Sequence, residues 1–335
     1  MNLILIRPNE RSTNTNDGAT IVDLSPNDER TQHLLNHLHK KNGDSVSIGF
    51  IDSHGGWKCE AKVEYRPTNN KNNDTNATVG VRLLVPMTNE PSDVIKQSLS
   101  ASTPQITILL AVPFPSRLKY LWPVMASFTS VTRIIIVKST LSNPEFIQSK
   151  ALHASTYQPL IEKGMSQGRR TRPIEVDVCV DEEYETISRS LLERLRLVPS
   201  SSNDSNITSR IFFDCGDEKD ASAPPPPARD IVLEQCCFET TLTRTTTTTK
   251  ATAVAPSAIL AIGPERGWTD DEANLFVNEC GFRSATLGSS ILRVDTAVVS
   301  ALSIVSAALD ECQKKVVIDD RGKRKRIGSI ERQNV

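Results

Sequence analysis

Cysteine pairs that could bind zinc or build a disulfide framework are missing from this chain of 335 residues. Its seven cysteines are odd in number and scattered, and no two of them form a Cys-x-x-Cys motif. The sequence therefore predicts no metal site, and reduced, mostly buried thiols in an intracellular protein.

Charge of one sign and long apolar runs are missing as well. The chain has 39 Lys and Arg against 40 Asp and Glu, so any contact with nucleic acid needs a local basic patch. No apolar run approaches the roughly 18 residues of a membrane span, and residues 1–7 resemble a first β-strand more than a targeting peptide. We expect a soluble, cytoplasmic protein without a membrane contact, with the chloroplast or mitochondrion as the alternative location.

Two common nucleotide-binding motifs are also absent. The chain has neither a Gly-x-Gly-x-x-Gly dinucleotide fingerprint nor a Walker loop. Polar, low-complexity tracts interrupt it instead, and such composition cannot bury enough apolar surface to offset the entropy of ordering. We predict flexible insertions at these tracts, which cover residues 68–78, 199–209, 221–230 and 240–252.

The first part of the chain, residues 1–88, is rich in short strand patterns. Strands are predicted at residues 45–51, 59–65 and 79–85, and a helix from residue 27 or 28 to residue 38. These elements indicate a small β-barrel with one helix, which is too small for an obvious catalytic cleft and suits a substrate-binding domain.

The second part, residues 104–312, alternates buried strands with helices, which is typical of an open α/β sheet. Strands are predicted at residues 106–112, 133–137, 175–180, 210–213, 258–262 and 283–287. Helices are predicted at residues 116–128, 143–163, 182–195, 270–280 and 295–311. Residues 313–335 form a charged tail whose basic run at 321–326 indicates a disordered end; a nuclear signal or an RNA-contacting arm is the alternative.

One glycine loop, residues 263–267 (Gly-Pro-Glu-Arg-Gly), follows a predicted strand and precedes a helix start. Thr269 and Glu272 have the spacing of a capping box, which fixes where that helix begins. Glycines at such a turn let backbone N–H groups approach a ligand closely. An ordinary strand-to-helix turn is an equally good interpretation of this loop alone.

A second glycine loop, residues 287–293 (Leu-Gly-Ser-Ser-Ile-Leu-Arg), also lies between a predicted strand and a helix. Its last residue, Arg293, needs an acidic or phosphate partner if it is buried or faces a ligand. A salt bridge to Asp295 or Glu265 is the alternative to a ligand contact. Two such loops about two dozen residues apart could form one pocket.

Read together, the two segments resemble one family closely. The pattern Gly-Pro-Glu-x-Gly-aromatic-Thr-x-x-Glu, followed by Leu-Gly-x-x-Ile-Leu-Arg-x-Asp-Thr-Ala, is similar to the ribosomal RNA small subunit methyltransferase E family of the SPOUT superfamily. Arg266 departs from that pattern, because glycine is common there. The resemblance covers most of the chain.

The resemblance implies a PUA-like RNA-binding β-barrel, an α/β domain tied into a trefoil knot, and a homodimer. It also implies that S-adenosylmethionine binds in the knot, held largely by the backbone of three loops. The implied cofactor contacts are Phe213, Asp214, Ile262, Gly263, Pro264, Gly267, Leu287, Gly288, Ile291 and Leu292.

The implied reaction is methylation of uridine N3 in small-subunit ribosomal RNA, so the ribosomal RNA and the small ribosomal subunit are the implied partners. We expect Arg293 to stabilise developing negative charge or to hold a phosphate, and Glu265 to act as a base or to orient the cofactor. Bracing of the loop is the alternative for Glu265.

A basic patch of Arg169, Arg170 and Arg172 could hold RNA phosphates, with a solvated loop cluster as the alternative. Two other functions remain open: methylation of another RNA, and an inactive RNA-binding or ribosome-assembly factor with the same fold.

Overall fold

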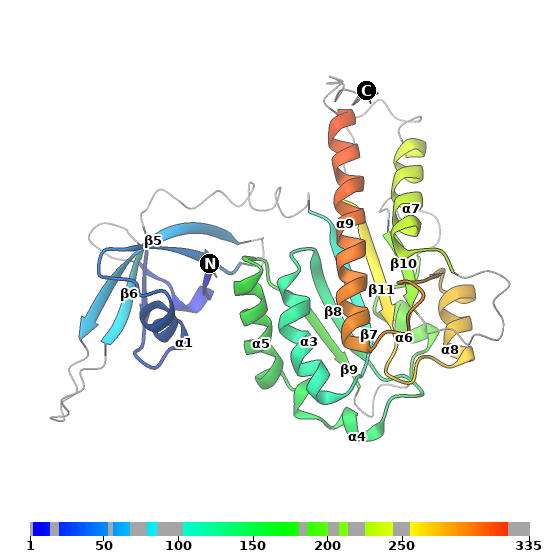
Figure 1. Ribbon diagram of the computed structural model, residues 1–335, viewed down its shortest axis with the longest axis horizontal. Coiled ribbons are helices and arrows are strands. Elements are labelled where there is room, and N and C mark those ends of the chain that lie inside the picture. Colours follow the sequence, from blue (N-terminus) through cyan, green and yellow to red (C-terminus); the bar gives the residue numbers. More distant parts are fainter. Residues whose placement is uncertain are drawn as a thin grey trace, which may run out of the picture.

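The computed structural model describes two sheets that lie side by side (Figure 1). The described residues are 3–13, 20–52, 56–67, 79–85, 103–180, 186–199, 208–213, 225–243 and 255–320, with backbone only for 236–243 and 315–320. Asp214 and the basic run at 321–326 lie outside them, as do residues 68–78, 200–207, 221–224 and 244–252 of the predicted insertions. No helix in the described part is long and apolar enough to cross a membrane.

The N-terminal sheet is mixed and has six strands. Their order is β1 (Ile4–Ile6), β4 (Ser45–Phe50), β5 (Trp57–Pro67), β6 (Val79–Val85), β3 (Thr20–Leu24) and β2 (Ser12–Thr13). Only the β1–β4 pair is parallel, and no pairing within the described residues joins β1 to β2, so the sheet is a half-barrel. The three predicted strands are confirmed, whereas β2 and β3 were not predicted.

One helical segment packs on this sheet, as predicted. It consists of α1 (Glu29–Gln32) and a π-helical turn, η2 (His33–His37). The Asp28 side chain accepts a hydrogen bond from Arg30 N and caps the helix. A short 3-10 helix, η1 (Pro8–Glu10), follows β1.

The second sheet is entirely parallel, which confirms the predicted α/β class. Its order is β12 (Arg283–Ala285), β10 (Thr208–Phe213), β11 (Ser257–Ile262), β7 (Gln105–Ala111), β8 (Val131–Val137) and β9 (Glu175–Cys179). Both faces are covered, since Ile108 and Leu110 belong to one apolar cluster and Leu109 and Ala111 to another.

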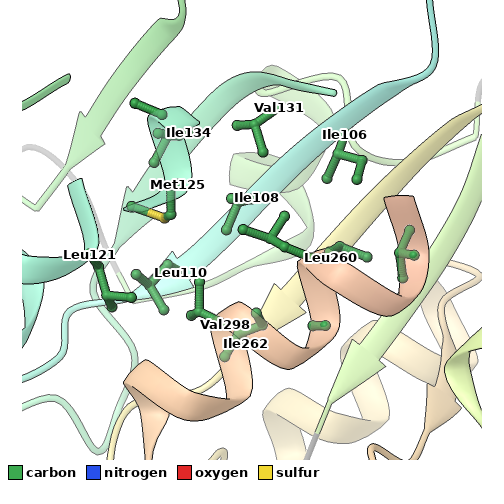
Figure 2. Close-up of a cluster of buried hydrophobic side chains, with 14 of the residues drawn as sticks. Ile106, Ile108, Leu110, Leu121, Met125, Val131, Ile134, Leu260, Ile262 and Val298 are labelled. Carbon is green, nitrogen blue, oxygen red and sulfur yellow. The ribbon is translucent and has the colours of Figure 1, made fainter. Parts of the chain in front are cut away.

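Helices form the two outer layers. The first face carries α3 (Pro115–Ser127), α5 (Ala154–Gln167), α7 (Ala228–Thr243) and α9 (Val294–Asp320). The second face carries α6 (Arg189–Arg194), α8 (Asp270–Asn274) and the π-helical turn η5 (Leu275–Glu279). Figure 2 shows the first core, where Leu121 and Met125 of α3 and Val298 of α9 meet Ile108 and Leu260 of the sheet.

The helix predicted at residues 143–163 is three helices. They are α4 (Pro144–Ile147), the 3-10 helix η4 (Lys150–Leu152) and α5. Ser149 ends the first segment and caps the second, because its side chain accepts a hydrogen bond from Ala151 N. The helix predicted at 182–195 begins only at Arg189, where the Ser188 side chain accepts from Leu191 N.

Two helices differ from what composition predicts. Helix α7 was not predicted and overlaps the insertions expected at 221–230 and 240–252, because its Ile231 and Val232 are fully buried in the first core. Helix α9 continues to Asp320, past its predicted end at residue 311 and past the predicted start of the tail. The other domain limits stay predictions.

The first strand joins the two sheets. Leu3 N donates to Ser166 O at 3.1 Å, and Ser166 Oγ donates to Leu3 O at 2.5 Å. The Arg7 guanidinium also pairs with Glu162 at 2.6 Å. Both acceptor and donor groups of α5 thus hold the N-terminal sheet against the second one.

Candidate active site

A cavity of 430 Å³ lies at the carboxyl edge of the parallel sheet, where β10, β11 and β12 end. Ligands in open α/β sheets bind at this edge, and the volume is in the usual range of small-molecule sites, about 300–1,000 Å³. The predicted site residues that line it are Phe213, Ile262, Gly263, Pro264, Glu265, Gly267, Leu287, Gly288, Ile291, Leu292 and Arg293. The structure therefore brings together both glycine loops, although the role of each residue stays a prediction.

The first loop is tightly packed at its start. A Cβ atom on Gly263 would lie 3.1 Å from Trp268 Nε1, and that buried indole donates to Phe213 O at 3.3 Å. Gly267 closes the turn with φ +72° and donates its N–H to Pro264 O at 3.0 Å. The indole thus ties this loop to the end of the neighbouring strand.

The capping box after this loop is confirmed. Thr269 Oγ1 accepts from Glu272 N at 3.3 Å, and Glu272 Oε2 accepts from Thr269 N at 2.9 Å. Helix α8 and the adjoining turn η5 cover residues 270–279, close to the predicted 270–280.

The second loop begins earlier than predicted, because β12 ends at Ala285 rather than at residue 287. Thr286 Oγ1 donates to Gly288 O at 2.8 Å and accepts from Gly288 N at 3.0 Å, which turns the chain at a φ of +128° that favours glycine. Beyond this turn the Ile291 side chain is 84% exposed, although it lines the cavity.

Arg293 is paired within its own segment. Its Nη2 lies 2.7 Å from Asp295 Oδ2 and its Nε lies 3.2 Å from Asp295 Oδ1, while 68% of the Arg293 side chain stays exposed. The hydrogen bond from Arg293 lowers the pKa of Asp295, and the same bond raises the pKa of the guanidinium. Of the two salt bridges considered from sequence, the structure contains the one with Asp295.

Glu265 braces the first loop against helix α3. Its Oε1 accepts from Phe114 N at 3.0 Å and from Arg117 Nη1 at 2.8 Å. This geometry favours the bracing alternative over a free catalytic base. Arg117 also lines the cavity and was not predicted; a cation in the first turn of a helix that follows a buried strand was the available signal.

The predicted basic patch is only partly at the surface. Arg170 is 4% exposed and donates to three backbone carbonyls, those of Phe128, Val131 and Arg172. Burial, with the charge of Arg172 as a second cause, lowers the pKa of Arg170 to about 10. Arg170 is therefore a structural group, and its prediction as an RNA contact is corrected, because segments from α3, β8 and the turn before β9 enclose it.

The other two arginines differ in exposure, and the Nη1 atom of Arg172 is buried. Arg169 is exposed, with φ +54°, and Arg172 is half-buried. Both precede β9, so they lie at the amino edge of the parallel sheet, opposite to the cavity. Within the described residues, no group of three or more His, Cys, Asp and Glu side chains could hold a metal ion.

Comparison with known proteins agrees with this geometry. Residues 229–306 match the model of a family described as an RNA methyltransferase domain. The ribosomal RNA small subunit methyltransferase E of Synechocystis is 41% identical over 61 residues, which are 18% of this chain and 20% of that protein. The chain is similar to the ribosomal RNA small subunit methyltransferase E family. The resemblance inferred from the two glycine loops is thereby confirmed.

A second relative of that name, from Treponema pallidum, is 40% identical over 57 residues, or 17% of this chain and 21% of that protein. These alignments span only about a fifth of the curated relatives' length.

Two solved structures share the fold over nearly the whole chain. Ribosomal RNA small subunit methyltransferase E from Neisseria gonorrhoeae, bound to S-adenosylmethionine, superposes with a TM-score of 0.51 at 16% identity and covers 92% of this chain and 97% of that one. A probable rRNA methyltransferase from Porphyromonas gingivalis has a TM-score of 0.54 at 15% identity and covers 92% and 99%. At such low identity they establish the fold alone.

Proposed function

We propose that this protein transfers a methyl group from S-adenosylmethionine to N3 of a uridine in small-subunit ribosomal RNA. The observation that carries the proposal is the meeting of both glycine loops at one cavity on the carboxyl edge of the sheet. In the proposal the chain also forms the knot and the homodimer of the family that it resembles. It acts where its ribosome is, in the cytoplasm or, alternatively, in an organelle.

The cavity suits this cofactor because its walls are mostly backbone and small or apolar side chains. Gly263, Gly267 and Gly288 leave backbone groups accessible, while Phe213 and Leu287 supply apolar surface. Such walls fit a ligand that combines an adenine ring with a charged amino-acid end. S-adenosylmethionine supplies an activated methyl group on a sulfonium.

The chain's own part in the reaction is to position the groups and stabilise charge. The N3 proton of uridine has to leave as N3 attacks, so negative charge develops on the base. Arg293 lies at the rim of the cavity with an exposed side chain and can meet that charge or the neighbouring phosphate. A target base has to leave its stack to reach this rim, which favours single-stranded or loop RNA.

Arg169 and Arg172 are proposed to hold RNA phosphates. Burial lowers the pKa of Lys58 on β5, and the positive charge of Arg169 is a second cause. Neutralising Arg169 should weaken RNA binding for all sequences alike and reduce the slope of log K against log[salt] by about 1. An unchanged slope would show that this cluster is only solvated surface.

Calorimetric titration with S-adenosylmethionine tests the enzyme proposal directly. We expect the unmodified protein to bind, and Gly263→Trp and Leu287→Trp to lose binding because an indole would fill the cavity. Gly43→Trp is the matched control, since nothing lies within 4 Å of a Cβ at this turn far from the cavity. Absence of binding by the unmodified protein would reject the proposal.

Mapping of methylated uridines in RNA from a deletion strain tests the substrate. Loss of N3-methyluridine from small-subunit ribosomal RNA is the expected result. Loss from another RNA would support the other substrate, and cofactor-independent RNA binding without any lost methylation would support the inactive assembly factor.

A further inference from the structure

The link between Glu265 and helix α3 joins segments that are about 150 residues apart in sequence. Glu265 lies in the middle of the loop after β11, and its Oε1 accepts from Phe114 N and Arg117 Nη1 at 3.0 and 2.8 Å. Strands β7 and β11 are neighbours, so the start of α3 and this loop emerge at the same edge of the sheet. The contact is therefore a product of the sheet order.

Helix α3 needs this contact for its own start. Its N-cap residue is Phe114, whose side chain makes no capping hydrogen bond, and Pro115 follows. Glu265 accepts from the backbone N–H of the N-cap residue, which is what the glutamate of a capping box does from within a helix. A carboxylate at a helix N-terminus is also favoured by the helix dipole.

The ion pair is well sheltered for a group at a cavity rim. The Arg117 and Glu265 side chains are 30% and 28% exposed, and charge-assisted hydrogen bonds gain strength as water is excluded. The rest of the loop is held by its turn bond from Gly267 N to Pro264 O and by its link to Trp268.

Arg117 also lines the same cavity as the second loop. A hydrogen bond from Arg293 lowers the pKa of Asp295, and the positive charge of Arg117 lowers it further. Asp295 follows the second glycine loop directly. Arg117 therefore lies at the cavity that both glycine loops line, while its direct contact is with Glu265 of the first loop.

We propose that Arg117 is a positioning residue that holds the first glycine loop at the cavity through Glu265. It orders residues 263–267 before the cofactor arrives, so that binding does not have to bear the cost of ordering the loop. The inference rests on the proposed function for the identity of the ligand, but the ordering of the loop does not depend on it.

Arg117→Gln tests the role through two measurements, S-adenosylmethionine affinity by calorimetry and amide hydrogen exchange of residues 263–268 in the protein without cofactor. We expect affinity to fall about tenfold, as for the loss of one charge-assisted hydrogen bond, and exchange of the loop to rise. Arg117→Lys should retain most of the affinity. Arg189→Gln is the matched control, because Arg189 forms a similar 2.9 Å pair with Glu193 on α6.

Coupling distinguishes a specific contact from general damage. The double variant of Arg117→Gln with Glu265→Gln should bind no more weakly than the weaker single variant, because both remove the same interaction. Additive losses would overturn the inference. If Arg117→Gln fails to fold, Glu265→Gln supplies both readouts, since its amide oxygen still accepts from Phe114 N.

The two proposals fail in different ways. A wild-type protein that does not bind S-adenosylmethionine contradicts the proposed function, whereas loop exchange still reports on Arg117. Unchanged loop exchange and unchanged affinity in both Arg117→Gln and Glu265→Gln would overturn the positioning role alone.

Discussion

Arg117 and Arg293 at the cavity rim and the buried Arg170 near the junction of the two sheets are held in opposite ways. At the rim, Arg117 pairs with Glu265 and Arg293 pairs with Asp295. At the junction, the structure places Arg170 on backbone carbonyls, with 4% of the residue exposed. Carboxylate partners accompany accessible guanidinium groups, and carbonyl partners accompany the buried one.

This difference separates cations that can act from cations that support the fold. An exposed pair such as Arg293–Asp295 can open for a substrate at small cost, because water replaces the lost partner. Arg170 cannot move without giving up three hydrogen bonds to backbone carbonyls, one of them fully buried. Changes at the junction should therefore alter stability, and changes at the rim should alter function.

The largest loss of stability is expected for Arg170→Ala. The substitution removes three donated hydrogen bonds and a buried stem, which should lower the free energy of unfolding by about 3 kcal/mol. Chemical denaturation measures this, with the adjacent, exposed Arg169→Ala as control, expected within about 0.5 kcal/mol of wild type. A loss below about 1 kcal/mol in Arg170→Ala would contradict the structural role proposed for Arg170.

Gly56→Ala should have the next largest effect on stability. A Cβ there would lie 2.6 Å from Thr171 Cβ and would also meet Phe50 O, at a backbone φ of +61°. We expect a loss of about 2 kcal/mol in chemical denaturation, from overpacking added to backbone strain. Gly43→Ala, at φ +87° with open space around it, carries the strain alone and should lose about 1 kcal/mol. Equal losses would show that the junction is not tightly packed at Thr171.

Much of the fold follows from local sequence patterns. The parallel strands are continuous apolar runs bounded by turns, and the Thr269 capping box marks the helix start that the structure contains. Helix α7 was missed because proline-rich and threonine-rich tracts flank it, while its buried core contacts come from a short stretch that includes Ala228, Ile231 and Val232. The composition identifies the polar segments on both sides of α7, but it does not predict the helix between them.

The two glycine loops of the site could be predicted from the sequence, but the ion pair that holds the first of them could not. Both glycine loops could be found from their own residues, whereas the partner of Glu265 is Arg117, 148 residues away. That pairing depends on β7 lying beside β11, which no local pattern encodes. The burial of Arg170 is similarly a consequence of tertiary contact, because its acceptors Phe128 and Val131 lie 42 and 39 residues away in sequence.

Arg30 of the N-terminal part forms ion pairs with Glu10 and Asp28, and all three side chains are partly buried. The stability that these ion pairs provide should fall in acid. Burial raises the pKa of Glu10 and Asp28, but hydrogen bonds and charge from Arg30 outweigh it, so both pKa values lie below their ordinary range. Groups with a lowered folded pKa stabilise the protein above their ordinary pKa, near 4, and this stability is lost as the pH falls through the folded pKa.

Arg30→Gln should therefore lower the free energy of unfolding by about 1.5 kcal/mol at pH 7 and flatten its dependence on pH below about 4. Denaturation at a series of pH values measures both. Arg82→Gln, which breaks a more exposed pair with Asp23, is the control and should change the acid slope less. An unchanged slope in Arg30→Gln would mean that this half-buried cluster behaves like exposed surface.

The smallest change in stability and the clearest change in function are expected at Arg293. Because its side chain is 68% exposed and its pair with Asp295 is solvated, Arg293→Gln should leave the midpoint of chemical denaturation unchanged. Methyl transfer should fall about 100-fold in kcat, with little change in S-adenosylmethionine affinity, if the guanidinium stabilises charge that develops only during the reaction. Asp295→Asn separates pairing from catalysis: it frees Arg293 while keeping its charge, so it should retain most of the activity. Equal losses of activity in the two variants would mean that the ion pair, rather than the free guanidinium, is what the reaction requires.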